Sequence, residues 1–287
     1  MVTEGERVAS RQVLAGGVRC HLLEAGAGPP LVLLHGTAID SASLSYGPSL
    51  PRLAERHLVL APDWPGYGRS EVPRVDLTIH DYVALLGALL DAVGMERVHL
   101  AGFSMGGAVA LGFALHAPQR VRSLSLVGSY GLATSLPVPL LPYLALRAPA
   151  LRRGVVWGLR RSRLLTSLVL RTLVFADPKL VTRRLVADVH EQLRAPEAER
   201  SFVAWLRGEV RPFSLGTSFA ERLTELRLPT LLLHGRNDRV ISWRYAEQAQ
   251  RRIPHAELTV VPGCGHWVPR EAPEVFRSEL LAFTSRH

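Results

Sequence analysis

The sequence predicts an α/β protein with a mostly parallel central sheet, helices on both faces of that sheet, and an inserted helical cap. Short and nearly continuous apolar runs alternate along the chain with segments of helical periodicity, which is typical of buried parallel strands joined by helices. Residues 131–215 break this alternation and lack clear strands. The chain has 287 residues, of which 47% are hydrophobic, enough to bury a sizeable core.

The first half of the chain supplies most of the expected strands. The strands "VRCHLLEA" and "LVLLH" are joined by the turn "GAGPP", and "HLVLAPD" follows. Residues 78–93 show a helical pattern that ends near Gly94. A strand at 98–103, a helix after Ser104 and the strand "VRSLSLVG" complete this half.

The alternation resumes after residue 215. The strands "TLLLHG" and "AELTVVPG" are each followed by a helix, at 242–252 and 273–284. We therefore assign residues 1–130 and 216–287 to one core domain. The helical segments of residues 131–215 are expected to form a cap (lid) over the carboxyl edge of the sheet, with Leu151, Val155 and Leu159 sharing one helix face.

Composition excludes several classes of protein. No apolar run reaches the length of a membrane span, and the charged start "MVTEGERVASRQ" has no signal-peptide core. Cys20 and Cys264 are far apart and lack metal-ligand spacing. We expect a cytoplasmic protein without disulfides, bound metal or cofactor.

The net charge of +9 comes almost entirely from arginine, because Lys179 is the only lysine. Between Gly131 and Arg211 there are 13 arginines and one lysine against six acidic residues. The first interpretation of this excess of arginine is that the side chains solvate the outer face of the cap helices. The alternatives are that they attract anionic substrates or make peripheral contact with an anionic lipid surface. Nucleic-acid binding is not expected, since interleaved aromatic residues and a recognised motif are absent from the sequence.

Ser104 lies in "GFSMGG", between the strand at 98–103 and the helical pattern that follows. Gly102 and Gly106 leave room for a sharp turn where side chains would collide with neighbouring backbone. Such a turn exposes the hydroxyl at the end of the sheet. The pattern predicts a nucleophilic serine.

Two further polar groups follow strand ends at the same edge of the predicted sheet. Asp238 comes after "TLLLHGRN", and His266 comes after "LTVVPGCG". A serine needs a base to accept its proton, and a carboxylate fixes the tautomer of that imidazole. The turn "GSYG" at 128–131 offers no alternative carboxylate. Ser104, Asp238 and His266 are therefore the expected catalytic residues.

The backbone N–H groups of Met105 and Thr37 are expected to stabilise the oxyanion of the reaction. Tyr130 and Trp267 are candidates for the substrate pocket, with a core position as the alternative. The remaining polar residues near strand ends are expected to be structural: His35 and His234 through bonds to loop backbone, Asp63 in a turn, and Cys264 as a buried thiol.

Together the segments "GFSMGG", "LHG", "DWPGYGRS", "HGRNDRV" and "GCGHWVPREAPEVF" resemble the α/β-hydrolase superfamily over nearly the whole chain. The resemblance implies the α/β-hydrolase fold, the serine-nucleophile branch and residues 131–215 as the lid. Epoxide hydrolases and haloalkane dehalogenases of this superfamily carry aspartate in the place of Ser104.

The main functional expectation is a serine esterase that cleaves a small or medium carboxylic ester through an acyl-enzyme. The alternative is hydrolysis of a carbon–carbon bond in a vinylogous diketone acid, because "SMGGAVAL" and "CGHW" resemble meta-cleavage product hydrolases. Those enzymes show an "HGGGPG"-type loop where this chain has "HGTAID". Perhydrolysis, acyl transfer and a non-catalytic ligand receptor on the same fold also stay open.

Overall fold

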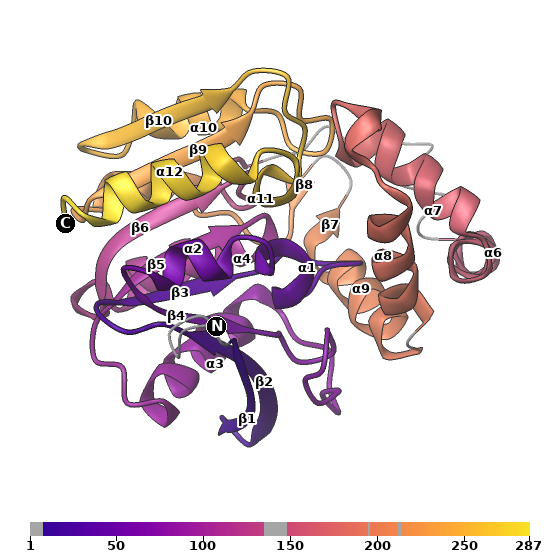
Figure 1. The fold of residues 1–287 in the computed structure, drawn as a ribbon, viewed down its shortest axis with the longest axis horizontal. Helices are drawn as coiled ribbons and strands as arrows, with labels where there is room; N and C mark the ends of the chain where they lie inside the picture. The colour runs from indigo at the N-terminus through magenta and orange to yellow at the C-terminus, as the bar shows by residue number, and fades with distance from the viewer. Residues whose placement is uncertain (1–7, 135–147, 195, 212–213) are drawn as a thin grey trace, which may run out of the picture.

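An eight-stranded sheet forms the centre of the molecule in the computed structural model, which describes residues 8–134, 148–194, 196–211 and 214–287 (Figure 1). The order of strands across the sheet is β1-β2-β4-β3-β5-β6-β9-β10. The strands are β1 (Ala9–Ala15), β2 (Val18–Ala25), β3 (Pro30–Leu34), β4 (Leu58–Pro62), β5 (Val98–Phe103), β6 (Val121–Val127), β9 (Thr230–Gly235) and β10 (Ala256–Val261).

The prediction of a mostly parallel sheet is confirmed. All pairs from β4 to β10 are parallel, whereas β2 pairs antiparallel with both β1 and β4. The strand β1 was not predicted, because its first four residues, "ASRQ", form no apolar run, and all four are exposed in the structure. It forms a hairpin with β2 through a turn at Gly16 and Gly17, both of which have positive φ.

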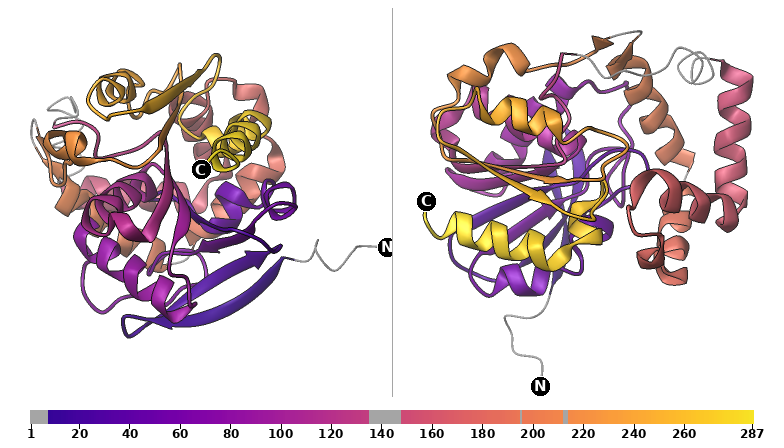
Figure 2. Two further views of the ribbon diagram at one scale, coloured as in Figure 1. Left: turned by 90° about the vertical axis from the view of Figure 1, so that its left-hand side faces the viewer. Right: turned by 90° about the horizontal axis from the view of Figure 1, so that it is seen from above.

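Helices cover both faces of the sheet (Figures 1 and 2). One face carries α3 (Ile79–Ala92), α4 (Met105–His116) and α10 (Arg244–Gln250). The other face carries α1 (Ala42–Tyr46), α2 (Leu50–Ala54), α11 (Val268–Glu271) and α12 (Pro273–Thr284). A capping box at Thr78 and Asp81 begins α3.

The two faces form two separate hydrophobic cores. Leu100 and Val109 belong to the core under α3 and α4, and Leu33 and Phe276 to the core under α12. The helix α4 is buried along almost its whole length, so the turn before it is held from both sides. This rigidity matters because Ser104 lies in that turn.

The inserted segment between β6 and β9 is helical where the structure describes it. Its elements are α6 (Pro149–Arg161), α7 (Arg163–Val169), a π-helical turn (Leu170–Val174), α8 (Arg183–Arg194) and α9 (Pro196–Glu209), followed by the two-residue strands β7 (Val210–Arg211) and β8 (Ser214–Leu215). These helices group together at one end of the sheet (Figure 1). The prolines at 137, 139 and 142 lie outside the described residues. The boundaries 131 and 215 of a cap domain stay a prediction.

The expected apolar face of α6 is only partly buried. Leu159 lines an internal pocket, whereas Leu151 and Val155 are half exposed on the outer side of the helix. Val156, which was not part of the expected face, is buried instead. In the part of the chain that the structure describes, we find no helix with the length and hydropathy to span a bilayer.

Candidate active site

Ser104 occupies the sharp turn between β5 and α4. Its backbone has φ 53° and ψ −116°, a conformation that costs energy for a residue other than glycine and is held by the packed elements on either side. A Cβ on Gly102 would collide with the carbonyl oxygen of Gly106, and a Cβ on Gly106 would collide with that of Leu34. Both glycines of the motif are therefore required by close backbone approach.

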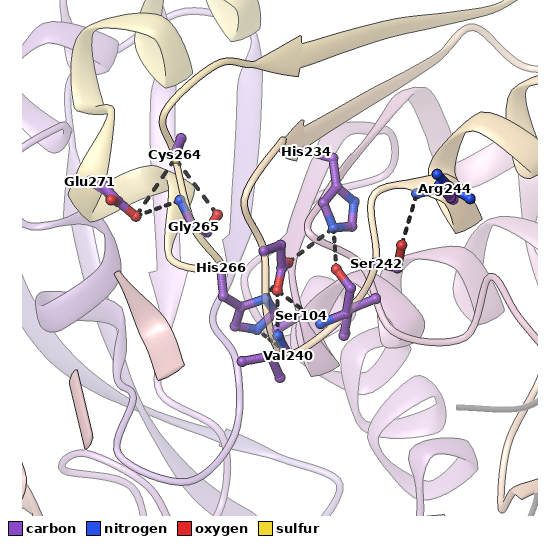
Figure 3. Close-up of polar contacts among 11 residues, drawn as sticks. Ser104, His234, Val240, Ser242, Arg244, Cys264, Gly265, His266 and Glu271 are labelled. Carbon is purple, nitrogen blue, oxygen red and sulfur yellow. Dashed lines mark hydrogen bonds and ion pairs between the residues drawn. The ribbon is translucent and has the colours of Figure 1, made fainter. Parts of the chain in front are cut away.

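The structure brings together the three side chains that sequence analysis selected. The Oγ of Ser104 lies 3.1 Å from Nε2 of His266, and Nδ1 of His266 lies 2.7 Å from Oδ2 of Asp238 (Figure 3). Because a carboxylate only accepts, Nδ1 carries the proton and Nε2 is free to accept the serine proton. This arrangement is able to generate a nucleophile.

Asp238 receives four hydrogen bonds. Its Oδ1 accepts from the backbone N–H groups of Val240 at 2.7 Å and Ile241 at 2.8 Å. Its Oδ2 accepts from His266 and also from Nε2 of His234 at 3.0 Å. Burial raises the pKa of this carboxyl, but the adjacent His266 and His234 outweigh burial and hold the pKa below its ordinary value. The carboxylate is thus kept ionised although its side chain is fully buried.

His234 was expected to be a structural residue that bonds to loop backbone. It does bond to the carbonyl of Ile241 at 2.9 Å, but its second contact is the Asp238 carboxylate. The sequence signal was the spacing "HGRND", in which the histidine, the last but one residue of β9, stands four residues before the aspartate. Sequence reasoning missed this contact because the spacing alone does not show that the turn folds back.

A pocket of about 360 Å³ opens above Ser104 and His266. Its roof comes from the inserted helices, including Val156, Leu159 and Trp205, and its floor from loops that follow strand ends. Both predicted pocket residues, Tyr130 and Trp267, line it. No lysine or arginine is among the described residues of the lining, so this space suits an apolar group.

The two predicted oxyanion donors come from two separate segments of the chain, the start of α4 and the loop that follows β3. Met105 is the first residue of α4, where an N–H group has no partner within the helix. Thr37 lines the pocket, and its hydroxyl bonds to the hydroxyl of Tyr67 at 2.8 Å. Its neighbour Ala38 has a φ of 66°, so the backbone of this loop turns sharply at the pocket. The role of these N–H groups stays a prediction.

Asp40 holds the loop that carries Thr37, a role that sequence analysis did not assign. Its carboxylate accepts from the N–H of Gly36 at 2.7 Å and from the hydroxyl of Ser45. That hydroxyl in turn accepts the indole N–H of Trp267 at 2.8 Å. Asp40 therefore connects the loop after β3 to the residue beside His266. Burial raises the pKa of Asp40 despite these bonds.

Tyr130 ties the core to the inserted helices. Its hydroxyl donates to the carboxylate of Glu209 at 3.1 Å, and the same carboxylate accepts from Thr217 at 3.0 Å. Since the hydroxyl is engaged, Tyr130 offers its ring rather than its hydroxyl to a ligand in the pocket.

Glu271 holds the loop of His266 from the other side (Figure 3). Its carboxylate accepts from the N–H groups of Gly265 at 2.7 Å, Ala176 at 2.7 Å and Asp177 at 2.9 Å. The N–H of His266 donates to the carbonyl of Val174 at 2.8 Å. The loop of His266 is thus fastened to the segment that follows α7.

The other expected structural residues behave as predicted. His35 bonds to the carbonyl of Gly36 and to the N–H of Trp64. Asp63 accepts from the N–H groups of Ala42 and Arg69. The thiol of Cys264 is buried, and burial raises its pKa, so it is poorly suited to form a thiolate. Within the described ranges, no cluster of three or more histidine, cysteine or acidic side chains is arranged to hold a metal ion.

Comparison with known proteins identifies the family of this chain. The profile of the alpha/beta hydrolase fold family matches residues 29–273. A 2-hydroxy-6-oxo-2,4-heptadienoate hydrolase of Pseudomonas putida is 32% identical over 264 residues, which covers 91% of each chain. The acetyltransferase component of an acetoin cleaving system from Pseudomonas putida is 34% identical, with 97% of this chain and 70% of that protein covered. A meta-cleavage product hydrolase from Pseudomonas fluorescens superimposes with a TM-score of 0.83 at 26% identity, covering 97% of this chain and 98% of the other.

Proposed function

This chain belongs to the α/β-hydrolase family, and we propose that it hydrolyses a carbon–carbon bond in a vinylogous diketone acid of the meta-cleavage type. The observation that carries a hydrolytic role is the hydrogen-bonded chain from Ser104 through His266 to Asp238 beneath the pocket. The bond type is supported by the relatives, since the similar hydrolases of Pseudomonas putida and Pseudomonas fluorescens act on such compounds by name. The relatives favour this alternative over the esterase expected first.

In the proposed reaction, the hydroxyl of Ser104 attacks the ketone carbonyl next to the bond to be broken while His266 takes the serine proton. The N–H groups of Met105 and Thr37 stabilise the oxyanion. Collapse of that oxyanion breaks the carbon–carbon bond, and the electron pair moves into the conjugated acid, which takes its proton from the imidazolium of His266. Water, deprotonated by His266, then releases the acyl group from Ser104 as a carboxylic acid.

Asp238 holds the tautomer of His266 and stabilises the imidazolium that forms in both steps. In this proposal the helices of residues 131–215 act as a lid that limits the access of water, supported by the place of Val156, Leu159 and Trp205 in the pocket lining. The apolar lining selects an apolar substituent on the ketone.

Hydrolysis of a neutral ester is a second candidate, and one specific observation favours it. A diketone acid carries a carboxylate, yet the described residues of the pocket lining include no lysine or arginine to pair with it. An ester with an apolar acyl chain needs no such partner.

The test is a substrate panel of nitrophenyl esters of increasing chain length, run beside one vinylogous diketone acid. We expect kcat/KM for the diketone acid to exceed that for every ester by at least about tenfold, a difference of about 1.4 kcal/mol in transition-state binding. The reverse ranking would assign the esterase. Ser104→Ala is the control and should abolish both turnover and labelling by a fluorophosphonate probe. Intact turnover in that variant would overturn the nucleophile assignment.

A further inference from the structure

Exposed apolar side chains are concentrated on the inserted helices. Eleven large hydrophobic side chains are exposed among the residues that the structure describes, and seven of them fall between residues 151 and 180. Leu164 is 82% exposed, more than any other, and Trp157 is 61% exposed. Exposed apolar side chains that gather on neighbouring helices mark an interaction site more often than isolated exposed leucines do.

Five of these exposed side chains belong to α6 and α7, and the other two, Leu173 and Leu180, belong to the segments that follow. The inner sides of the same helices are occupied, since Val156, Leu159 and Val169 face the pocket and Thr166 is buried. Figure 1 and the right-hand view of Figure 2 both draw α6 and α7 at the end of the molecule farthest from the sheet. The outer side is therefore free to meet a large flat partner.

The charge of this region has a single sign. Residues 149–174 include six arginines and no acidic residue. Arg153, Arg161 and Arg163 are exposed, and the guanidinium of Arg161 lies 5.0 Å from the ring centre of Trp157. A groove of about 720 Å³ opens beside them. It is lined by Arg153, Trp157, Arg160, Arg161, His190 and Arg194.

We propose that this outer cap face, defined by Leu151, Val155, Trp157, Leu164, Leu168, Arg153, Arg161 and Arg163, docks on an anionic lipid bilayer. Basic side chains mixed with leucine and tryptophan on one helical surface match the interface of such a bilayer, where apolar groups enter the acyl boundary and arginines meet lipid phosphates. The groove offers the arginines a site for an anionic headgroup.

A second copy of the chain is a poorer occupant of the same face. Pairing two outer cap faces would bring the arginines of both copies together without an acidic partner in residues 149–174. A bilayer with anionic lipids satisfies the apolar and the basic side chains at once. Docking would also bring the pocket beneath α6 and α7 close to the membrane. The inference goes beyond the proposed reaction and does not depend on it.

Vesicle co-sedimentation of the full chain tests the proposal. We expect binding to phosphatidylcholine vesicles that contain about 30% phosphatidylglycerol. Binding to pure phosphatidylcholine should be much weaker, and about 300 mM salt should release the protein that binds at about 20 mM.

Two variants test the two kinds of contact. Arg153→Gln/Arg161→Gln/Arg163→Gln should weaken binding at least tenfold, because each basic side chain near an anionic surface is worth about a fivefold factor. Leu164→Ser/Leu168→Ser should also weaken it at least tenfold.

Matched controls carry the same changes on the core domain. Arg56→Gln/Arg122→Gln/Arg227→Gln alters three exposed arginines, and Leu14→Ser alters an exposed leucine of β1. Both should bind as the wild type does. Equal losses in the cap and control variants, or absence of co-sedimentation with anionic vesicles at low salt, would overturn the proposal.

Sedimentation velocity without lipid supplies the second readout. We expect a monomer-sized species for the wild type and for Leu164→Ser/Leu168→Ser alike. A wild-type oligomer that this variant dissociates would reassign the face to self-association and overturn lipid docking. Hydrolysis of a water-soluble substrate should be unchanged in all these variants, so a failure of docking is distinguishable from a failure of the proposed reaction.

Discussion

His234 and His266 donate to the same oxygen atom, Oδ2 of Asp238, at 3.0 and 2.7 Å. The other carboxylate oxygen accepts two backbone N–H groups. Four donors fix the carboxylate in one orientation, and its pKa is held below the ordinary value although burial alone would raise it. The imidazole of His266 is therefore aimed at Ser104 by an acid that is itself immobilised.

Asp238→Asn should lower kcat by roughly 10³- to 10⁴-fold, because an amide in this place permits the wrong tautomer of His266. KM should change little. Steady-state kinetics with the substrate that the panel selects gives both values. Asp76→Asn, a change at an exposed position outside the site, is the control. An almost unchanged rate in Asp238→Asn would show that another residue is the carboxylate partner of His266.

His234→Phe should lower kcat at least about tenfold at unchanged KM, since it removes one donor from the carboxylate that positions His266. His234→Gln keeps a donor near Nε2 and should recover most of the rate. Thermal unfolding of both variants separates this effect from a loss of folding. If His234 only supports the fold, His234→Phe and His234→Gln should have equal activity when their stabilities are equal. That result would contradict a role of His234 in positioning Asp238.

Glu271→Ala should destabilise the fold by about 1–3 kcal/mol and lower kcat, because three backbone N–H groups lose their acceptor. These groups connect the loop of His266 to Ala176 and Asp177. Glu279→Ala is the matched control, since this glutamate of α12 accepts a single bond from Thr259. Urea unfolding and kcat at one pH provide the measurement. If Glu271→Ala loses stability but keeps full activity, Glu271 does not position His266.

His99→Asn should reduce the loss of stability on acidification. Burial lowers the pKa of His99 to about 4, whereas an unfolded histidine titrates near 6.5. Between these values the unfolded chain binds a proton that the folded chain does not, so stability is complete above the unfolded pKa and falls with falling pH. From pH 7 to 5 this group accounts for a loss of about 2 kcal/mol. Urea unfolding at both pH values compares wild type with variant, and parallel losses would contradict the prediction.

Local sequence patterns were sufficient for seven of the eight strands of the central sheet and for the turn at Ser104. Continuous apolar runs identified the parallel strands because both faces of such strands are buried. The helices α1 and α2 were missed, since each has only five residues and shows no period. The strand β1 was missed because its first four residues, "ASRQ", form no apolar run.

By itself the sequence determined which residues follow strand ends, and thereby the set Ser104, Asp238 and His266. It did so because parallel strands deliver their carboxyl ends to one edge. Only the tertiary structure decided that His234 contacts Asp238 and that Glu271 reaches Ala176, 95 residues away in the chain. It also decided that the outer sides of α6 and α7 stay exposed. Helical periodicity in a sequence shows that a helix has an apolar side. Whether another element covers that side of α6 or α7 depends on how the inserted helices pack on the sheet.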